Sequence, residues 1–181
     1  MKRFFVTLMA LGLVQPAWTA EPAPGWRTPD GKQVPETDAM RTVQGFSGRL
    51  LITSDSDWQE KWDTPAEHTP VFNQADEVGT GGTLTLLTFL ANPKVGADGM
   101  TDVACDFVML RPDGSASTGA KDLPCFKVKL EGDPTHVYLS TTNLQFLAEP
   151  GDPPGRWTFR ITLKDRLRGV EVPLSASFSL K

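Results

Sequence analysis

The end of the chain alternates apolar and polar side chains, and few folds can accept such a pattern. In the stretch 155–165, every second residue is apolar, namely Trp157, Phe159, Ile161 and Leu163. After a short turn the alternation resumes in 170–181, with apolar residues at Val170, Val172, Leu174, Ala176, Phe178 and Leu180. A period of two buries one face of a strand and leaves the other in water. The sequence therefore predicts two half-buried antiparallel strands.

Shorter strand-like runs come before this pair. They are "RLLITS" at 49–54, "TLTLLTFLA" at 83–91, "DVACDFVML" at 102–110, "CFKVKL" at 125–130, "HVYLS" at 136–140 and "NLQFLAE" at 143–149. The run 83–91 is apolar on both faces, so we expect it to be central and buried. Pro173 falls on the polar phase of the last strand, which predicts a sheet edge or a bulge there. Short strands at regular spacing predict an all-β fold, an antiparallel β-sandwich.

The first twenty residues have the layout of a secretory signal peptide. Lys2 and Arg3 precede a short apolar run, and a small-residue exit follows. That run is too short to span a bilayer, and no later stretch reaches about 18 apolar residues. We place the cleavage after Ala20, with a cut after Ala17 as the alternative. The sequence therefore predicts a periplasmic or secreted protein without a membrane span.

The exported part reads as one domain with an N-terminal arm. Residues 21–45 hold four prolines and little apolar periodicity, which predicts an extended or loosely ordered arm. Trp26 is the exception, and we expect it to pin the arm to the body. Residues 46–181 then form the sandwich, whose length is sufficient for a real core.

Two cysteines remain, Cys105 and Cys125. Export places them in an oxidising compartment, so we expect a disulfide. In the chain-entropy model a bridge over such a short loop contributes about 3 kcal/mol. The alternative, a redox or metal pair, lacks both a C-x-x-C spacing and a nearby histidine.

The charge distribution argues against nucleic acid as a partner. Loss of Lys2 and Arg3 with the signal peptide changes the formal net charge from −4 to −6. The remaining basic residues are scattered, whereas phosphate binding requires them in a cluster.

Residues that could perform catalysis are few. The two histidines, His68 and His136, lie in different segments without a surrounding motif, and no G-x-S-x-G or H-E-x-x-H occurs. A hydrolase with scattered carboxylates is the third-ranked alternative, because no pair of acids is singled out. We therefore expect no enzymatic activity and no cofactor.

Acidic loops raise the question of calcium. The loop 96–102 offers Asp98 and Asp102, and the loop 149–155 offers Glu149 and Asp152. Calcium requires six to eight oxygen ligands, and no EF-hand spacing is present. Asp-Gly and Asp-Pro pairs also form ordinary turns, so we predict turns and no metal site.

Two tryptophans in a polar stretch, "SDSDWQEKWDTP" at 54–65, are the most informative candidate for a binding site. Ser54 or Ser56 as N-cap and Pro65 as terminator predict a short helix. A spacing of four places Trp58 and Trp62 on one face of it. Such a helix must bury that face to persist, and the open end or edge of the sandwich is the expected partner. The alternative is an exposed aromatic platform for a sugar or a protein, with Trp26 as a third member.

The last two strands carry a resemblance. Gly155, an aromatic residue two positions on, the alternating strand, Asp165 and a final Phe-x-Leu at 178–180 resemble the ending of bacterial immunoglobulin-like domains. With "DWQEKWDTP", "LTFLANP" and "RPDGS", the chain is similar to uncharacterised exported proteins of Gram-negative bacteria. The resemblance implies an immunoglobulin-like sandwich and an exported location, without an activity. Trp157 departs from it, because tyrosine is more usual there; the hydroxyl's corner hydrogen bond is then replaced by an indole or absent.

These observations together predict a non-catalytic binding module. The first partner we expect is another envelope protein, since sandwich edges accept partner strands, and the final strand 170–181 is the candidate edge. The second is a glycan held by Trp58, Trp62 and Trp26.

Overall fold

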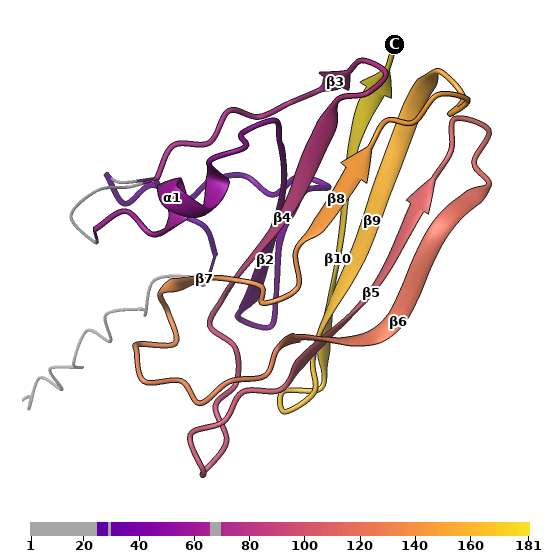
Figure 1. The fold of residues 1–181 in the computed structure, drawn as a ribbon. Coiled ribbons are helices and arrows are strands. Elements are labelled where there is room, and N and C mark those ends of the chain that lie inside the picture. The colour runs from indigo at the N-terminus through magenta and orange to yellow at the C-terminus, as the bar shows by residue number, and fades with distance from the viewer. Residues whose placement is uncertain (1–24, 29, 66–69) are drawn as a thin grey trace, which may run out of the picture.

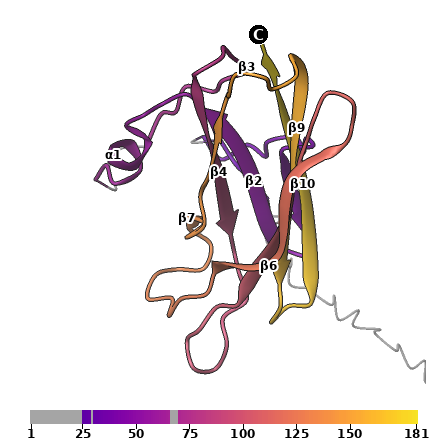
Figure 2. The same ribbon diagram turned by 45° about the vertical axis from the view of Figure 1, so that its right-hand side comes forward.

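The protein folds into two β-sheets and one short helix in a computed structural model that describes residues 25–28, 30–65 and 70–181. The two sheets face each other (Figures 1 and 2). This confirms the predicted all-β sandwich with one short helix. The signal peptide expected at 1–20 lies outside the described residues.

The first sheet contains β1 (Met40–Val43), β2 (Phe46–Thr53), β4 (Thr83–Ala91), β7 (Val137–Leu139) and β8 (Leu144–Leu147). Its order is β1-β2-β4-β7, and β8 also pairs with β4. All of these pairings are antiparallel. The strand predicted to be central, β4, has sheet neighbours on both sides and is buried along nearly its whole length.

The second sheet contains β3 (Glu77–Val78), β5 (Val103–Leu110), β6 (Ala116–Phe126), β9 (Gly155–Asp165) and β10 (Val170–Leu180). Its order is β3-β10-β9-β5-β6, with β3 parallel to β10 and the other pairs antiparallel. The run β6-β5-β9-β10 has the connectivity of strands C′, C, F and G of immunoglobulin domains, and β2-β4-β8 that of A, B and E. The connectivity is therefore immunoglobulin-like.

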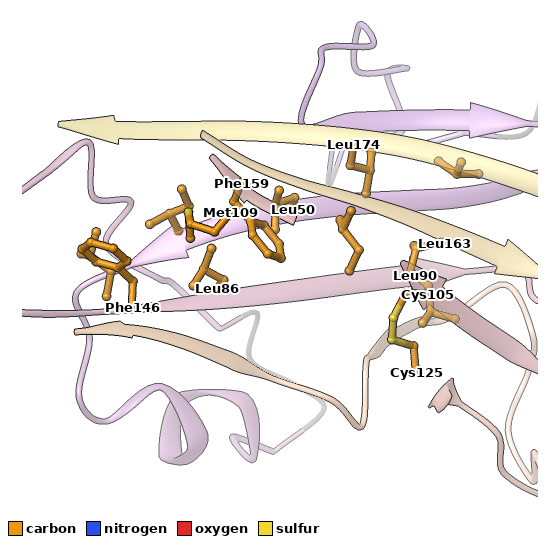
Figure 3. Packing of buried hydrophobic residues seen from close by; sticks show 14 of the residues in the cluster. Leu50, Leu86, Leu90, Cys105, Met109, Cys125, Phe146, Phe159, Leu163 and Leu174 are labelled. Carbon is orange, nitrogen blue, oxygen red and sulfur yellow. A yellow bond between two sulfur atoms is a disulfide. The ribbon is translucent and has the colours of Figure 1, made fainter. Parts of the chain in front are cut away.

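The core lies between the sheets (Figure 3). Leu50, Leu86 and Leu90 of the first sheet meet Phe159 and Leu163 of the second, and all five are at most 3% exposed. The alternation in β9 and β10 supplies the second sheet's apolar face, as the sequence predicts.

The predicted disulfide is present between Cys105 on β5 and Cys125 on β6, with Cα atoms 5.8 Å apart. Both cysteines are at most 1% exposed and belong to the core between the sheets. The bridge therefore fixes the end of β6 against the neighbouring strand.

Trp157 forms a hydrogen bond to the backbone near the start of β9. Its indole N–H donates to the carbonyl of Pro153, four residues upstream, at 3.0 Å. A tyrosine in this position of immunoglobulin domains donates to the backbone a few residues upstream in the same way. The structure thus shows an indole hydrogen bond at this position.

Pro173 lies on the outer edge of β10. The N–H groups of Ser175, Ser179 and Lys181 all point away from β9, to carbonyls outside the pair. Because strand N–H groups alternate sides, Pro173 shares this phase, and its missing N–H interrupts no hydrogen bond to β9. β3 reaches only Ser179 and Leu180, so β10 is a sheet edge at Pro173, as predicted.

The segment 21–45, which the sequence assigns to an arm, contains ordered structure. Its residues 40–43 form β1 and pair with β2 from Met40↔Arg49 to Val43↔Phe46. A further bridge joins Arg27 to Gln33. Within the described part of the arm, the chain therefore follows the edge of the first sheet.

Candidate functional site

The first sheet has an apolar outer face. Leu86 and Leu90 of β4 point into the core between the sheets, so Leu87 and Phe89 point outwards. Leu51 of β2 lies beside them, and all three outward residues are at most 5% exposed. The strand that is apolar on both faces thus creates a second surface that must be covered.

Aromatic side chains from outside the sheet provide this cover. The ring of Trp62 lies 5.4 Å from that of Phe89, and the ring of Phe72 lies 5.8 Å from it. Trp58, Trp26 and Leu139 complete the contact. We call Trp26, Trp58, Trp62 and Phe72, with the residues beneath them, the aromatic cluster.

Helix α1 (Trp58–Trp62) carries two members of this cluster. It lies on the side of the first sheet away from β9 and β10 (Figure 2). The predicted helix and the shared face of Trp58 and Trp62 are therefore confirmed. The expected partner was wrong: the helix does not close the open end or edge of the sandwich but packs on the sheet's outer face.

The arm is fixed to the same face by Trp26. Its indole N–H donates to the carbonyl of Gly48 on β2 at 3.2 Å, and its ring packs on the cluster. Trp26 is therefore joined to the body at the place where Trp58 and Trp62 gather.

A buried ion pair holds α1 in position. Lys61 Nζ lies 2.9 Å from Asp55 Oδ2, and the same carboxylate accepts both N–H groups of Asn73, backbone and side chain, at 2.8 Å. Burial alone would raise the pKa of Asp55, but the ammonium and the hydrogen bonds outweigh it and hold that pKa well below its usual range. The pair thus joins the helix to the strand before it and to the segment that carries Phe72.

The predicted N-caps were wrong. The residue before α1 is Asp57, and no side-chain capping bond forms there. Instead, two charged residues of this stretch, Asp55 and Lys61, form the ion pair that anchors the helix. Tertiary anchoring takes the place of capping because a helix of five residues has little stability of its own.

The tryptophans of α1 are only partly buried, and they line a groove of about 260 Å³ that we call the helix groove. Its residues are Trp58, Gln59, Trp62, Asp63, Leu139, Ser140 and Asn143. Among the described residues, none forms a hydrogen bond with the buried Oδ1 atom of Asn143. Buried polar atoms almost always have a partner, so this oxygen is an acceptor available to a ligand or to water.

The wall of the helix groove opposite α1 is tied to the disulfide. Thr141 donates both its N–H and its hydroxyl to the carbonyl of Cys125, at 2.8 and 3.0 Å. The hydroxyl of Ser140 reaches the same carbonyl at 3.0 Å, and that of Thr142 reaches Pro124 at 2.8 Å. The segment before Asn143 is therefore fixed to the end of β6.

Sequence reasoning missed part of this site. Phe72, Leu139 and Asn143 come from segments with no recognisable motif, and only the fold brings them to α1. One signal was available for their position: the run 83–91 is apolar on both faces, so that its outer face also needs a cover.

The other candidate residues do not assemble into a site. No group of three or more His, Cys, Asp or Glu that could hold a metal occurs among residues 25–28, 30–65 and 70–181. His136 is exposed, and His68 lies outside the described residues. Asp98 accepts the N–H of Met100 and Asp152 that of Glu149, as in ordinary turns.

The last strand offers little room for a partner strand. β10 pairs with β9 along its whole length, and its other edge is bonded to Asp38, Asp76 and Val78 of the same chain. At the other end of the second sheet lies β6, for which β5 is the one partner strand among the described residues. β6 contains Lys121 and Pro124, and its pairing with β5 has bulges. Such features protect an edge strand from further pairing.

No helix in the described part of the chain has the length and apolarity needed to cross a bilayer.

No protein-family model and no curated protein matches the chain. Solved structures with a similar arrangement include the DNA glycosylase AlkC of Pseudomonas fluorescens bound to abasic-site DNA, at 14% identity and a TM-score of 0.40 over 74% of this chain. The chain spans 29% of that enzyme's length.

Two further likenesses cover most of the other protein. The Niemann-Pick type C2 protein of the Japanese carpenter ant is 11% identical, with a TM-score of 0.41 over 73% of this chain and 89% of that one. The CARDB domain of a Pyrococcus furiosus protein is 12% identical, with a TM-score of 0.41 over 82% and 100%. Likenesses this distant assign neither a family nor an activity to the chain.

Proposed function

We propose that the chain is an exported, non-catalytic binding module that engages an envelope protein through the aromatic cluster. The observation that carries the proposal is the incomplete cover of the first sheet's outer face. Trp58, Trp62 and Phe72 are each partly exposed, and Val71 beside them is 77% exposed. Partly exposed tryptophans around a buried apolar centre are typical of the residues that dominate protein interfaces.

The exported location rests on two features. The N-terminal twenty residues have the pattern of a signal peptide, and the cysteines of the folded part are paired. A disulfide in a core is typical of oxidising compartments, where it persists. Both features support a periplasmic or secreted protein.

A glycan is the second candidate ligand, and the helix groove is the observation that favours it. The groove places two indoles beside Gln59, Asp63 and the unpaired Oδ1 of Asn143. Aromatic walls with a few convergent polar groups are typical of small-molecule sites. The hydroxyl groups of a sugar ring could donate to the carboxylate and to both amide oxygens.

A charge-introducing variant tests the protein partner. Gln59 is exposed on α1, so Gln59→Arg should fold normally while placing a cation in the interface. Ser117→Arg is the matched control, because Ser117 is exposed and belongs to β6, a strand of the second sheet that lies far from α1 (Figure 1). We expect one envelope protein to be retained by the wild-type chain and by Ser117→Arg but not by Gln59→Arg; retention by all three would contradict the proposal.

A titration with glycans separates the two candidates. Titration with peptidoglycan and polysaccharide fragments, followed by tryptophan fluorescence, measures glycan binding directly. Saturable binding that Asn143→Ala weakens, without any retained protein, would replace the protein partner by the glycan.

A further inference from the structure

A second hollow lies where the two sheets meet along one side of the sandwich. It has a volume of about 360 Å³, and we call it the edge cavity. Leu50 and Ile52 of β2 line one wall, and Ala176 and Ser177 of β10 line the other. The cavity is thus separate from the helix groove, with which it shares no residue.

Two segments of the chain cross from one sheet to the other and bound this cavity. At one end, Leu50 donates its N–H to the carbonyl of Ala39 at 2.8 Å, and Ser175 donates to Asp38 at 2.7 Å. Both acceptors belong to the segment before β1, which therefore bridges the sheets.

The other end is closed in the same way. Ala75 donates its N–H to the carbonyl of Ile52 at 2.9 Å, and Ser179 donates to Asp76 at 2.8 Å. Between these two segments, the edges of β2 and β10 are open for a short distance, where neither segment forms a hydrogen bond with them. The gap is too short for a partner strand to run along it.

Backbone donors point into this gap. Ser175 and Ser179 direct their N–H groups away from β9, so by strand alternation Ser177 between them does the same. On β2, Leu50 donates towards the same edge, so the N–H of Ile52 points there as well. Within the described residues, neither N–H has a backbone acceptor on that side.

The inner part of the edge cavity is apolar. Ala176 is the smallest of the core-facing residues of β10, and it remains only partly buried. The side chains of Leu50, Ile52 and Ala75 surround the space that this small residue leaves. A slot of this kind accepts an aliphatic chain with burial of its surface.

The rim is cationic although the chain as a whole is acidic. Arg27 and Arg49 both line the cavity, and no aspartate or glutamate does so among the described residues. Glu36, Asp38 and Asp76 are next in sequence to lining residues. Asp38 directs its carboxylate to Arg41 at 2.7 Å, and Glu36 accepts the N–H of Thr42 at 2.9 Å. Arg49 is exposed and forms no ion pair with any residue that the structure describes.

We propose that the edge cavity binds a small aliphatic monocarboxylate, with its chain beside Ala176 and its carboxylate held by Arg49 and by the N–H groups of Ile52 and Ser177. Guanidinium and backbone N–H groups form strong, charge-assisted hydrogen bonds with carboxylates. The volume lies at the lower end of the range of about 300–1,000 Å³ for small-molecule sites, which favours a short ligand over a large one.

Octanoate is the probe that tests this site, used below its micellar concentration with the full exported chain. Calorimetry measures its affinity, and the backbone amide signals of Ile52 and Ser177 in ¹⁵N-resolved NMR locate it. We expect saturable binding with shifts at these two amides, and 1-octanol, which lacks the charge, to bind at least about tenfold more weakly.

Two arginine variants provide the matched comparison. Arg49→Gln should weaken octanoate binding at least about tenfold, because it removes the charged donor from the rim. Arg156→Gln is the control, since Arg156 is an exposed arginine on β9 outside the cavity, and it should leave the affinity unchanged.

Three results would each overturn the proposal: no saturable binding of octanoate, equal binding of 1-octanol, or an unchanged affinity in Arg49→Gln. Shifts confined to the helix groove would also contradict it. Trp26 and Leu51 of the aromatic cluster also line the edge cavity, but Trp58 and Trp62 do not, so failure here leaves the proposed role of α1 in partner binding unaffected.

Discussion

The two outer faces of the sandwich are built from opposite chemistry. On the second sheet, Lys164 lies 2.7 Å from Asp106 and 3.1 Å from Asp122, with Arg166 beside them. The Lys164 ammonium lowers the pKa of the Asp106 carboxyl. On the first sheet, Leu87 and Phe89 are buried under aromatic side chains. The charged outer face of the second sheet is stable in contact with water, whereas the apolar outer face of the first sheet must be covered by other side chains.

The two outer faces therefore differ in what they contribute to stability and in the surface that they offer to a partner. The carboxylates in the ion pairs of the second sheet are 29% and 62% exposed, against 6% for Asp55, and pairs that water reaches contribute little to stability because water screens them. The cover of the first sheet is a five-residue helix, which the buried carboxylate of Asp55 holds, together with the side chains of Trp26 and Phe72. A cover of that size leaves aromatic surface exposed, and this surface is the part of the molecule that a partner can use.

The largest effect should come from the apolar centre of the first sheet's outer face. Phe89→Ala removes a ring that is 5% exposed and contacts Trp62 and Phe72, so the free energy of unfolding should fall by roughly 3–5 kcal/mol. Thr162→Ala, on the outer face of the second sheet, should change it by no more than about 0.5 kcal/mol. Urea denaturation measures both, and equal losses would remove the contrast between the faces.

Loss of the disulfide should rank next. In the Cys105→Ser, Cys125→Ser double variant, the free energy of unfolding should fall by about 3 kcal/mol, because the unfolded chain is no longer restricted by a closed loop. The segment 140–143 should also exchange its amide hydrogens faster, since Ser140 and Thr141 are bonded to the carbonyl of Cys125. Unchanged exchange there would show that the groove wall does not depend on the bridge.

Asp55 should have an intermediate effect. Asp55→Asn keeps the shape but removes the charge that Lys61 and Asn73 bind, so the loss of stability should be roughly 1.5–3 kcal/mol. Trp58 and Trp62 should become more accessible to a fluorescence quencher. If their accessibility stays the same, the ion pair does not hold the helix.

The same carboxylate predicts a pH dependence. The pKa of Asp55 is lower in the folded than in the unfolded chain, so its contribution is complete above the unfolded pKa of about 3.9. The contribution is lost as the pH falls from there towards the folded pKa. Wild type and Asp55→Asn should therefore differ in stability at pH 7, and the difference should shrink progressively as the pH falls below about 4; a constant difference between them would contradict this assignment.

The smallest effect should come from the ion pairs of the second sheet. Lys164→Ala breaks both of its contacts, yet we expect little change in the denaturation midpoint because water can replace them. A loss as large as that of Asp55→Asn would show that the charged face is as important to the fold as the aromatic one.

The sequence predicts those parts of the fold in which the residue pattern of a strand shows which of its faces are buried. β9 and β10 alternate strictly, and β4 is apolar throughout, so their burial follows from their residues. β6 was missed over most of its length because its exposed edge position selects polar residues. The strand expected at 125–130 was misplaced: β6 ends at Phe126, and residues 127–130 only bridge to the loop before β5.

The candidate site was predictable only in part, for a related reason. The spacing of Trp58 and Trp62 fixes their shared face, since it depends on the helix alone. The surface that they contact depends on the topology that places β2 beside β4, and Asn143 reaches the groove only through the loop between β7 and β8. Contacts of this long range leave no local pattern.

The most direct test of the central claim is site-specific photo-cross-linking in the native envelope. A photoreactive residue at position 59 on α1 is compared with one at position 117 on β6, both exposed positions on opposite faces of the sandwich. A single defined adduct from position 59 and none from position 117 is the predicted result. The same adducts from both positions, or an adduct from position 117 alone, would contradict the assignment of the aromatic cluster as the binding face.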